Sequence, residues 1–89
     1  MSLDTGTAGQ QELGALFEEV VRRSGLASWA APGVLRRALA SVGVVDPQAA
    51  QRDHFRRALP ELTKRMAVYL RPNELYLRVS AIEMLLEIP

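Results

Sequence analysis

The only histidine of the chain, His54, stands in the run Asp53-His54-Phe55, with Arg57 three residues further on. A helical histidine followed by a cation at this spacing could carry a phosphate in a phosphotransfer domain, because the cation would stabilise the phosphate. Such domains place the histidine beside a glycine-bearing turn of helix, and no glycine stands near His54. The interpretation that we favour is therefore a solvated surface histidine.

Other residues with chemical potential do not form a site either. Cysteine is absent, so the metal ligands that could accompany His54 are scattered carboxylates. Glu18 and Glu19 lie four residues before Arg22 and Arg23, which indicates an ion-paired helix face. The five serines lack a nucleophile-elbow motif, and no glycine-rich loop precedes a lysine. We therefore predict a protein that is not an enzyme, with no cofactor, metal or small-molecule substrate.

The arginines are the more informative charged residues. Four of them have no carboxylate at helical spacing: Arg36, Arg37, Arg52 and Arg71. We expect Arg36, Arg37 and Arg52 on the outer sides of their helices, where they could form a modest basic patch. Glu83 and Glu87 are also unpaired. A basic patch and a separate acidic one are suited to docking a partner protein, or a copy of the chain, head to tail.

Trp29, the only tryptophan, stands in the connector 27–31. An exposed aromatic ring on a loop could anchor a partner protein. The alternative that we favour is a ring that closes one end of the core, since a large ring covers much apolar surface in a small domain. The candidate partner-binding residues are therefore Arg36, Arg37, Arg52 and Trp29.

A helix-turn-helix is a second interpretation of the middle of the chain. The helix expected over 32–42, the turn 43–46 and a helix over 47–58 would place Gln48, Gln51 and Arg52 where base contacts are made. The formal net charge of only +1 and the single lysine argue against a surface that binds phosphates. DNA binding is therefore the alternative function.

Amphipathic patterns predict helices over 10–23 and 32–42, after a small polar tail over 1–9 that we expect to be flexible. Glycines after each pattern, Gly25 and Gly43, are expected to end these helices. Asp46-Pro47 is a start signal for a third helix. One face of the first helix carries apolar residues at steps of three and four: Leu13, Leu16, Phe17, Val20 and Val21.

The stretch 55–86 is expected to fold as a hairpin of two helices around the polar segment 71–73. Apolar residues recur at helical steps on both sides of Pro60, which either kinks one long helix or begins a new one. Asn73 would cap the second helix, whose two apolar stripes would make it central in the bundle. The alternative has a strand hairpin over 66–79 and a short C-terminal helix after a capping box at Ser80.

These patterns predict an all-α bundle of four to five helices, and the strand hairpin would make the fold α+β instead. The 89 residues, 48% apolar and 24% charged, are typical of a single globular domain, here over 10–89. No apolar run could span a membrane and no signal segment is evident, so we expect a cytoplasmic protein with no membrane partner. Arginine supplies ten of the eleven basic residues, a compositional habit of the source, which we expect to be bacterial.

The function predicted from these observations is a non-catalytic protein-protein interaction or adaptor module. Its partner would be another protein or a copy of the chain itself, and nucleic acid would be the partner in the alternative interpretation. Length and mixed-charge helices are compatible with a homotypic module of the death-fold kind, although no motif specifies a family.

Overall fold

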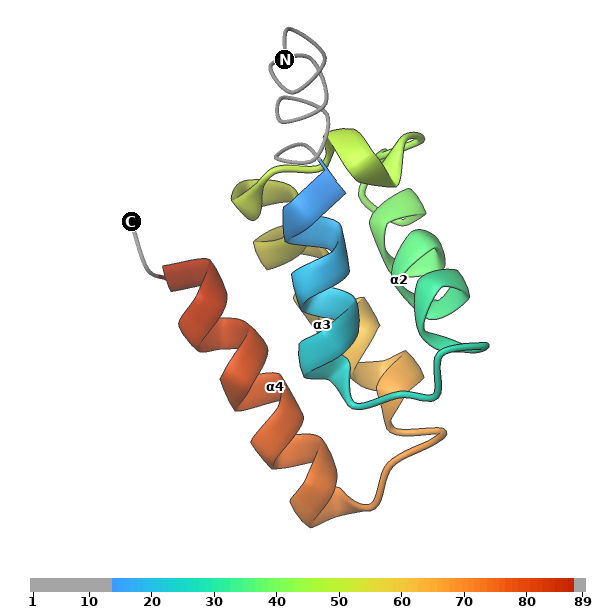
Figure 1. Cartoon of the computed structure of the whole chain (residues 1–89), viewed down its shortest axis with the longest axis vertical. Coiled ribbons are helices and arrows are strands. Elements are labelled where there is room, and N and C mark those ends of the chain that lie inside the picture. Colours follow the sequence, from blue (N-terminus) through green and yellow to red (C-terminus); the bar gives the residue numbers. More distant parts are fainter. Residues whose placement is uncertain (1–13, 88–89) are drawn as a thin grey trace, which may run out of the picture.

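The computed structural model describes residues 14–87, which form four α-helices and one short 3₁₀ helix (Figure 1). The N-terminal helix covers residues 14–24, and the other elements are α2 (Ala31–Ala40), the 3₁₀ helix η1 (Pro47–Ala49), α3 (Arg52–Met66) and α4 (Pro72–Glu87). The all-α prediction is confirmed. The strand hairpin over 66–79 is not formed, because that segment holds the end of α3 and the first half of α4. The expected tail over 1–9 and the expected first turn from Gln10 lie outside the described residues.

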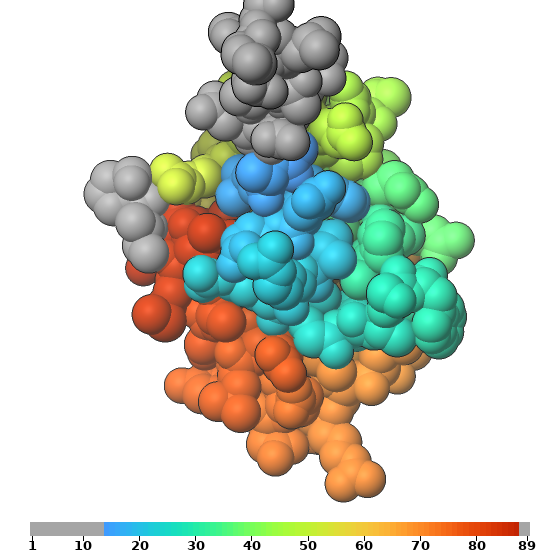
Figure 2. Space-filling view, viewed as in Figure 1, coloured from blue at the N-terminus to red at the C-terminus, as the bar shows by residue number. Residues whose placement is uncertain are grey.

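Successive helices run in alternating directions, so neighbours in the sequence are antiparallel (Figure 1). α2 and α4 flank the N-terminal helix, and α3 lies behind it. Figure 2 shows the N-terminal helix filling the space between α2 and α4 on this face. The four helices share one core, to which each contributes buried apolar residues.

The core is built from the apolar faces of all four helices. Each helix turns about 100° per residue, so apolar residues at steps of three and four gather on one side. The buried apolar cluster comprises Val20, Val34, Leu35, Ala38, Leu39, Ala50, Phe55, Ala58, Leu62, Met66, Ile82 and Leu86. α3 supplies the largest of these side chains, Phe55, and contacts both α2 and α4.

Glycine and proline set several of the helix ends. Gly25 and Gly43 adopt positive φ angles of 70° and 88°, the left-handed conformation that ends a helix at low cost for glycine. Pro72 is the first residue of α4, where its missing N–H is not needed, so the helix begins one residue before the expected cap Asn73. Pro60 lies inside α3, which continues as one helix through it.

The start of the third helix differs from its prediction. Asp46 does cap a helical turn, since its side chain accepts a hydrogen bond from Gln48 N at 3.1 Å, but this turn is only η1. α3 begins at Arg52, where the backbone N–H of Gln51 donates to Nδ1 of His54 at 2.9 Å. The imidazole thus replaces the acid or amide of an ordinary capping box. His54 is a partly exposed surface residue, as expected, and its capping of α3 is a role that the sequence analysis did not predict.

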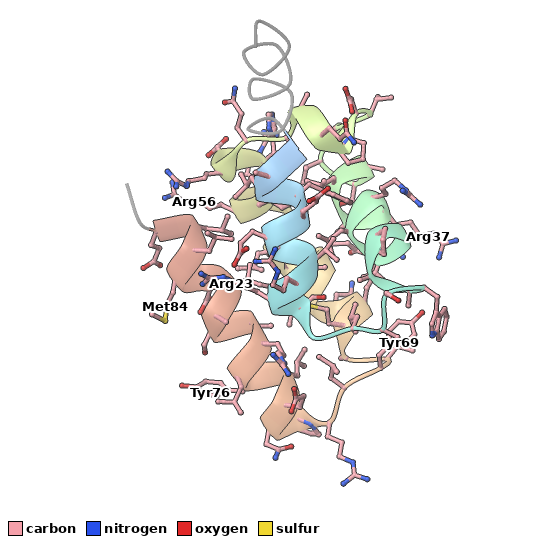
Figure 3. All side chains as sticks on the ribbon, in the orientation of Figure 1. Arg23, Arg37, Arg56, Tyr69, Tyr76 and Met84 are labelled. Atoms are coloured by element: carbon pink, nitrogen blue, oxygen red, sulfur yellow. The ribbon has the colours of Figure 1, made fainter. Side chains whose placement is uncertain are left out.

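α4 was expected to be central, and this prediction is wrong. Only the stripe with Ile82 and Leu86 is buried, with Leu75 and Val79 half-buried beside it. Leu77 and Met84, which form the second apolar stripe with Ala81, are exposed, and Met84 points away from the bundle at the left edge of Figure 3. No helix among the described residues is long and apolar enough to cross a membrane.

Candidate interaction surface

The basic residues fall into two groups according to their contacts. Four carboxylates, of Glu19, Asp53, Glu61 and Glu74, form ion pairs within their own helices. Arg56 donates to the carbonyl oxygen of Leu86 near the end of α4. The last carbonyls of a helix receive no hydrogen bond from an N–H of the same helix, so Arg56 provides the missing donor. Among residues 14–87, Arg36, Arg37, Arg52 and Arg71 form no ion pair, as their sequence spacing predicts. These four are the cations available to a partner.

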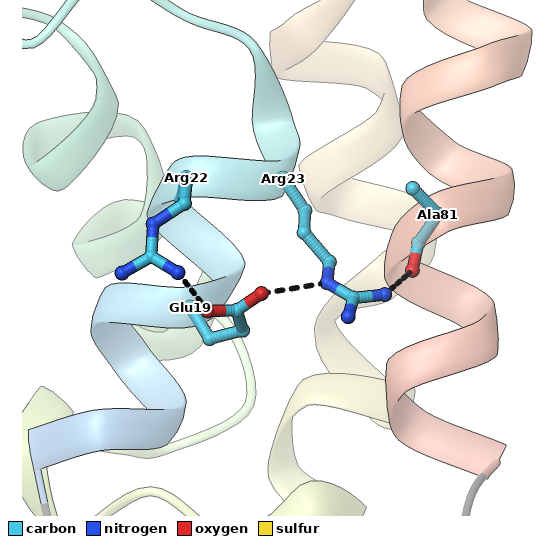
Figure 4. Close-up of polar contacts among 4 residues, drawn as sticks. All are labelled: Glu19, Arg22, Arg23 and Ala81. Atoms are coloured by element: carbon cyan, nitrogen blue, oxygen red, sulfur yellow. Dashed lines mark hydrogen bonds and ion pairs between the residues drawn. The ribbon is translucent and has the colours of Figure 1, made fainter.

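Glu19 forms ion pairs with two arginines, Arg22 and Arg23 (Figure 4). It accepts from Arg22 and, at 2.9 Å, from Nε of Arg23, whereas the sequence had suggested that Glu18 would pair with Arg22. The hydrogen bond from Arg23, aided by the charges of both arginines, lowers the pKa of Glu19 below its ordinary value. Arg23 also donates to the carbonyl oxygen of Ala81 in α4 at 2.9 Å. Arg23 is therefore a structural residue that joins two helices.

Arg36 and Arg37 lie on the outer side of α2 and rim an open groove. Gly33 and Ala40 lie between them on the helix surface, because 100° per residue places positions 33 and 40 on the line that separates 36 from 37. The rest of the groove is formed by the turn after α2. We call this surface the α2 face: Gly33, Arg36, Arg37, Ala40, Gly43, Val44 and Val45. Small residues form its floor and two guanidinium groups its sides.

The turn after α2 adds exposed apolar surface to this face. Val45 is 95% exposed, and the exposure of an aliphatic side chain to water is unfavourable in free energy. The nearest carboxylate in the sequence is that of Asp46. It accepts a hydrogen bond from the N–H of Gln48 and forms no ion pair among the described residues. Among residues 14–87, no carboxylate forms an ion pair with either arginine of the α2 face.

Trp29 is separate from the α2 face. Its side chain is 80% exposed and meets the ring of Tyr69 edge to face, with 6.4 Å between ring centres and 76° between planes. The expectation that this ring closes the core is therefore wrong, and its role as a partner anchor stays a prediction. Figure 3 places Tyr69 at the lower right of the molecule, on the turn after α3. Val68 beside it is also exposed.

Arg52 does not join Arg36 and Arg37 either, since it does not line the groove. It is the first residue of α3 and is exposed, while Gln48 lies in η1 and Gln51 precedes the helix. Residues 41–51 separate α2 from α3, which is longer than the three- or four-residue turn of a helix-turn-helix. The expected recognition helix over 47–58 is thus wrong in its boundaries, and DNA binding stays a prediction.

The outer side of α4 is an exposed surface that the sequence interpretation placed inside the protein. Leu77 is 61% exposed and Met84 is 64% exposed, and Tyr76 projects from the same helix (Figure 3). Leu77, Ala81 and Met84 follow one another at helical steps of four and three, so the stripe itself is visible in the sequence. We call this surface the α4 face: Tyr76, Leu77, Ala81, Glu83, Met84 and Glu87.

Comparisons with protein-family models, with curated proteins and with solved structures found no match to this chain.

Proposed function

We propose that this domain is a non-catalytic protein-interaction module that binds its partner through the α2 face. The observation that carries the proposal is the pair Arg36 and Arg37, both exposed, with no carboxylate bound to either among residues 14–87, beside the exposed Val45. Protein interfaces commonly join an apolar contact to surrounding charged groups in this way.

Each part of the α2 face contributes differently to binding. The planar guanidinium groups offer forked donors that fit carboxylates, and they give orientation and selectivity to the contact. Burial of Val45 against a partner would remove apolar surface from water, at roughly 25 cal/mol per Å². The small floor residues let another helix approach the backbone of α2 closely.

Reversal of both charges, Arg36→Glu with Arg37→Glu, tests this proposal. The change should leave the fold intact, because exposed substitutions away from special contacts usually change stability by no more than about 0.5 kcal/mol. It should also abolish the capture of partner proteins by the tagged domain, because two guanidinium groups that attract carboxylates are replaced by two carboxylates that repel them.

The matched control is Lys64→Glu with Arg71→Glu, which changes the net charge equally at two exposed positions outside the α2 face. Reversal of Arg22 and Arg23 is not suitable, because Arg23 holds α4 through the carbonyl of Ala81. Equal capture by the parent and the Arg36/Arg37 variant would show that the α2 face is only solubilising surface, and Trp29 with Tyr69 would then be the surface to test.

A further inference from the structure

Within residues 14–87 no other helix covers the α4 face, whose apolar residues follow a regular pattern. Leu77 and Met84, both exposed by more than half, are separated by seven residues and therefore lie two turns apart on one line of the helix. Ala81, between them, is small and only partly exposed. The surface thus presents two large apolar side chains with a low point between them.

The α2 face has small residues at the same seven-residue spacing at which the α4 face has large ones. Gly33 and Ala40 are also separated by seven residues, about 10.5 Å along the helix axis at 1.5 Å per residue. A side chain built on Gly33 would meet no atom within 4 Å. Two low points on α2 therefore have the spacing of the two raised side chains on α4, which is the condition for one helix surface to pack into another.

The charges of the two faces are complementary as well. α2 carries Arg36 and Arg37 and no acidic residue, whereas α4 carries three glutamates and one arginine. Glu74 is paired with Arg78, so Glu83 and Glu87 are the α4 glutamates without an ion pair among the described residues. At 100° per residue Glu87 and Glu83 lie on the same side of the line through Leu77 and Met84, so they place negative charge along one side of the raised side chains. This charge is opposite in sign to that of the unpaired arginines of the α2 face.

The two faces lie on opposite sides of the protein, so they cannot meet within one chain. In Figure 3, Arg37 points away from the bundle on the right, and Met84 and Tyr76 point away on the left. The geometry points to a head-to-tail contact in which the α2 face of one copy binds the α4 face of a second copy. This inference rests on the proposed function and names the partner of the α2 face. Because the two surfaces differ, the contact leaves one face of each kind open and can continue into a ring or filament.

Blocking each face separately gives the test. Gly33→Leu fills the floor of the α2 face, where an added Cβ meets no atom within 4 Å. Loss of a helical glycine also favours folding. Leu77→Gln with Met84→Gln removes the raised side chains of the α4 face at exposed helical positions. Val68→Gln, at an exposed position outside both faces, is the control.

Sedimentation velocity of the full chain should show that the parent and Val68→Gln form assemblies whose mass grows with concentration and falls as salt is added. Each face variant alone should stay monomeric, with thermal stability close to that of the parent. An equimolar mixture of the two variants should form a complex of two chains that grows no further, because each variant supplies the face that the other lacks.

Three results would overturn the inference: a parent that is monomeric at every concentration, either face variant associating alone as the parent does, or a mixture that stays monomeric although the parent associates. Association of the Gly33→Leu variant alone would indicate a symmetric contact between α4 faces, and association of the α4-face variant alone a contact that does not use the α4 face. A monomeric parent would leave the proposed function standing if the Arg36/Arg37 reversal still abolished the capture of a different protein, so the two failures are distinguishable.

Discussion

Arg23 joins the N-terminal helix to α4 through one guanidinium group, which contacts Glu19 on its own helix and the carbonyl oxygen of Ala81 on the other (Figure 4). Arg22, one residue earlier, contacts only Glu19, and its side chain is largely exposed. The two neighbouring arginines therefore differ in one contact between helices, which makes them a natural pair for comparison.

Arg23→Ala should lower the free energy of unfolding by about 1 to 2 kcal/mol, because the partly buried carbonyl oxygen of Ala81 loses its charged hydrogen-bond donor. Arg22→Ala should cost clearly less, because it removes only an exposed pair. Urea unfolding of both variants beside the parent measures the difference. Equal losses would show that the contact with Ala81 contributes nothing.

The same pair of variants has an expected pH dependence. The pKa of Glu19 is lowered in the folded protein, so its contribution to stability is complete above its ordinary pKa of 4.5 and is lost as pH falls through the lower folded value. In acid, the cost of Arg22→Ala should disappear. That of Arg23→Ala should fall only in part, because the bond to the Ala81 carbonyl does not titrate.

Contacts within one helix could be predicted at this scale, and contacts between helices could not. The spacing of Glu74 and Arg78, or of Glu61 and Arg65, places both partners on one helix surface. Arg23 and Ala81 are 58 positions apart, so only the packed bundle brings them together. The exposure of Trp29 was missed for the same reason, since burial of a loop residue depends on which elements surround it.

At the scale of elements, α4 shows how a helix with two apolar stripes is oriented. Its buried stripe packs against α3, and its other stripe forms the α4 face. The sequence shows both stripes but not which one faces inward, because both are apolar. The start of α3 could not be predicted for a different reason. Asp46-Pro47 is a typical helix start, but it begins only the short helix η1, and α3 begins after Gln51, where Gln51 and His54 form a second cap.

The two stripes of α4 should respond differently to truncation. Ile82→Ala should lower the free energy of unfolding by roughly 2 to 5 kcal/mol, because it leaves a cavity in the core. Leu77→Ala on the same helix should change it by less than about 0.5 kcal/mol, because that side chain is exposed. Thermal or urea unfolding distinguishes them, and comparable losses would mean that α4 packs through both stripes.

At the scale of the whole molecule, the fold separates charges that the sequence leaves unpaired. The sequence identified Arg36, Arg37, Glu83 and Glu87 by the absence of partners at helical spacing, which is a local property. Their placement on opposite sides follows from the order of the helices, with the N-terminal helix between α2 and α4 (Figures 1 and 2). A head-to-tail contact needs both properties together.

Amide NMR spectra of the isotope-labelled full chain, recorded at increasing concentration, test the head-to-tail contact most directly because they report on both faces in one experiment. The contact predicts concentration-dependent shifts or broadening at both the α2 face, residues 33–45, and the α4 face, residues 76–87, with little change around Trp29 and Tyr69. Spectra that do not change with concentration, or changes confined to one of the two faces, would contradict it.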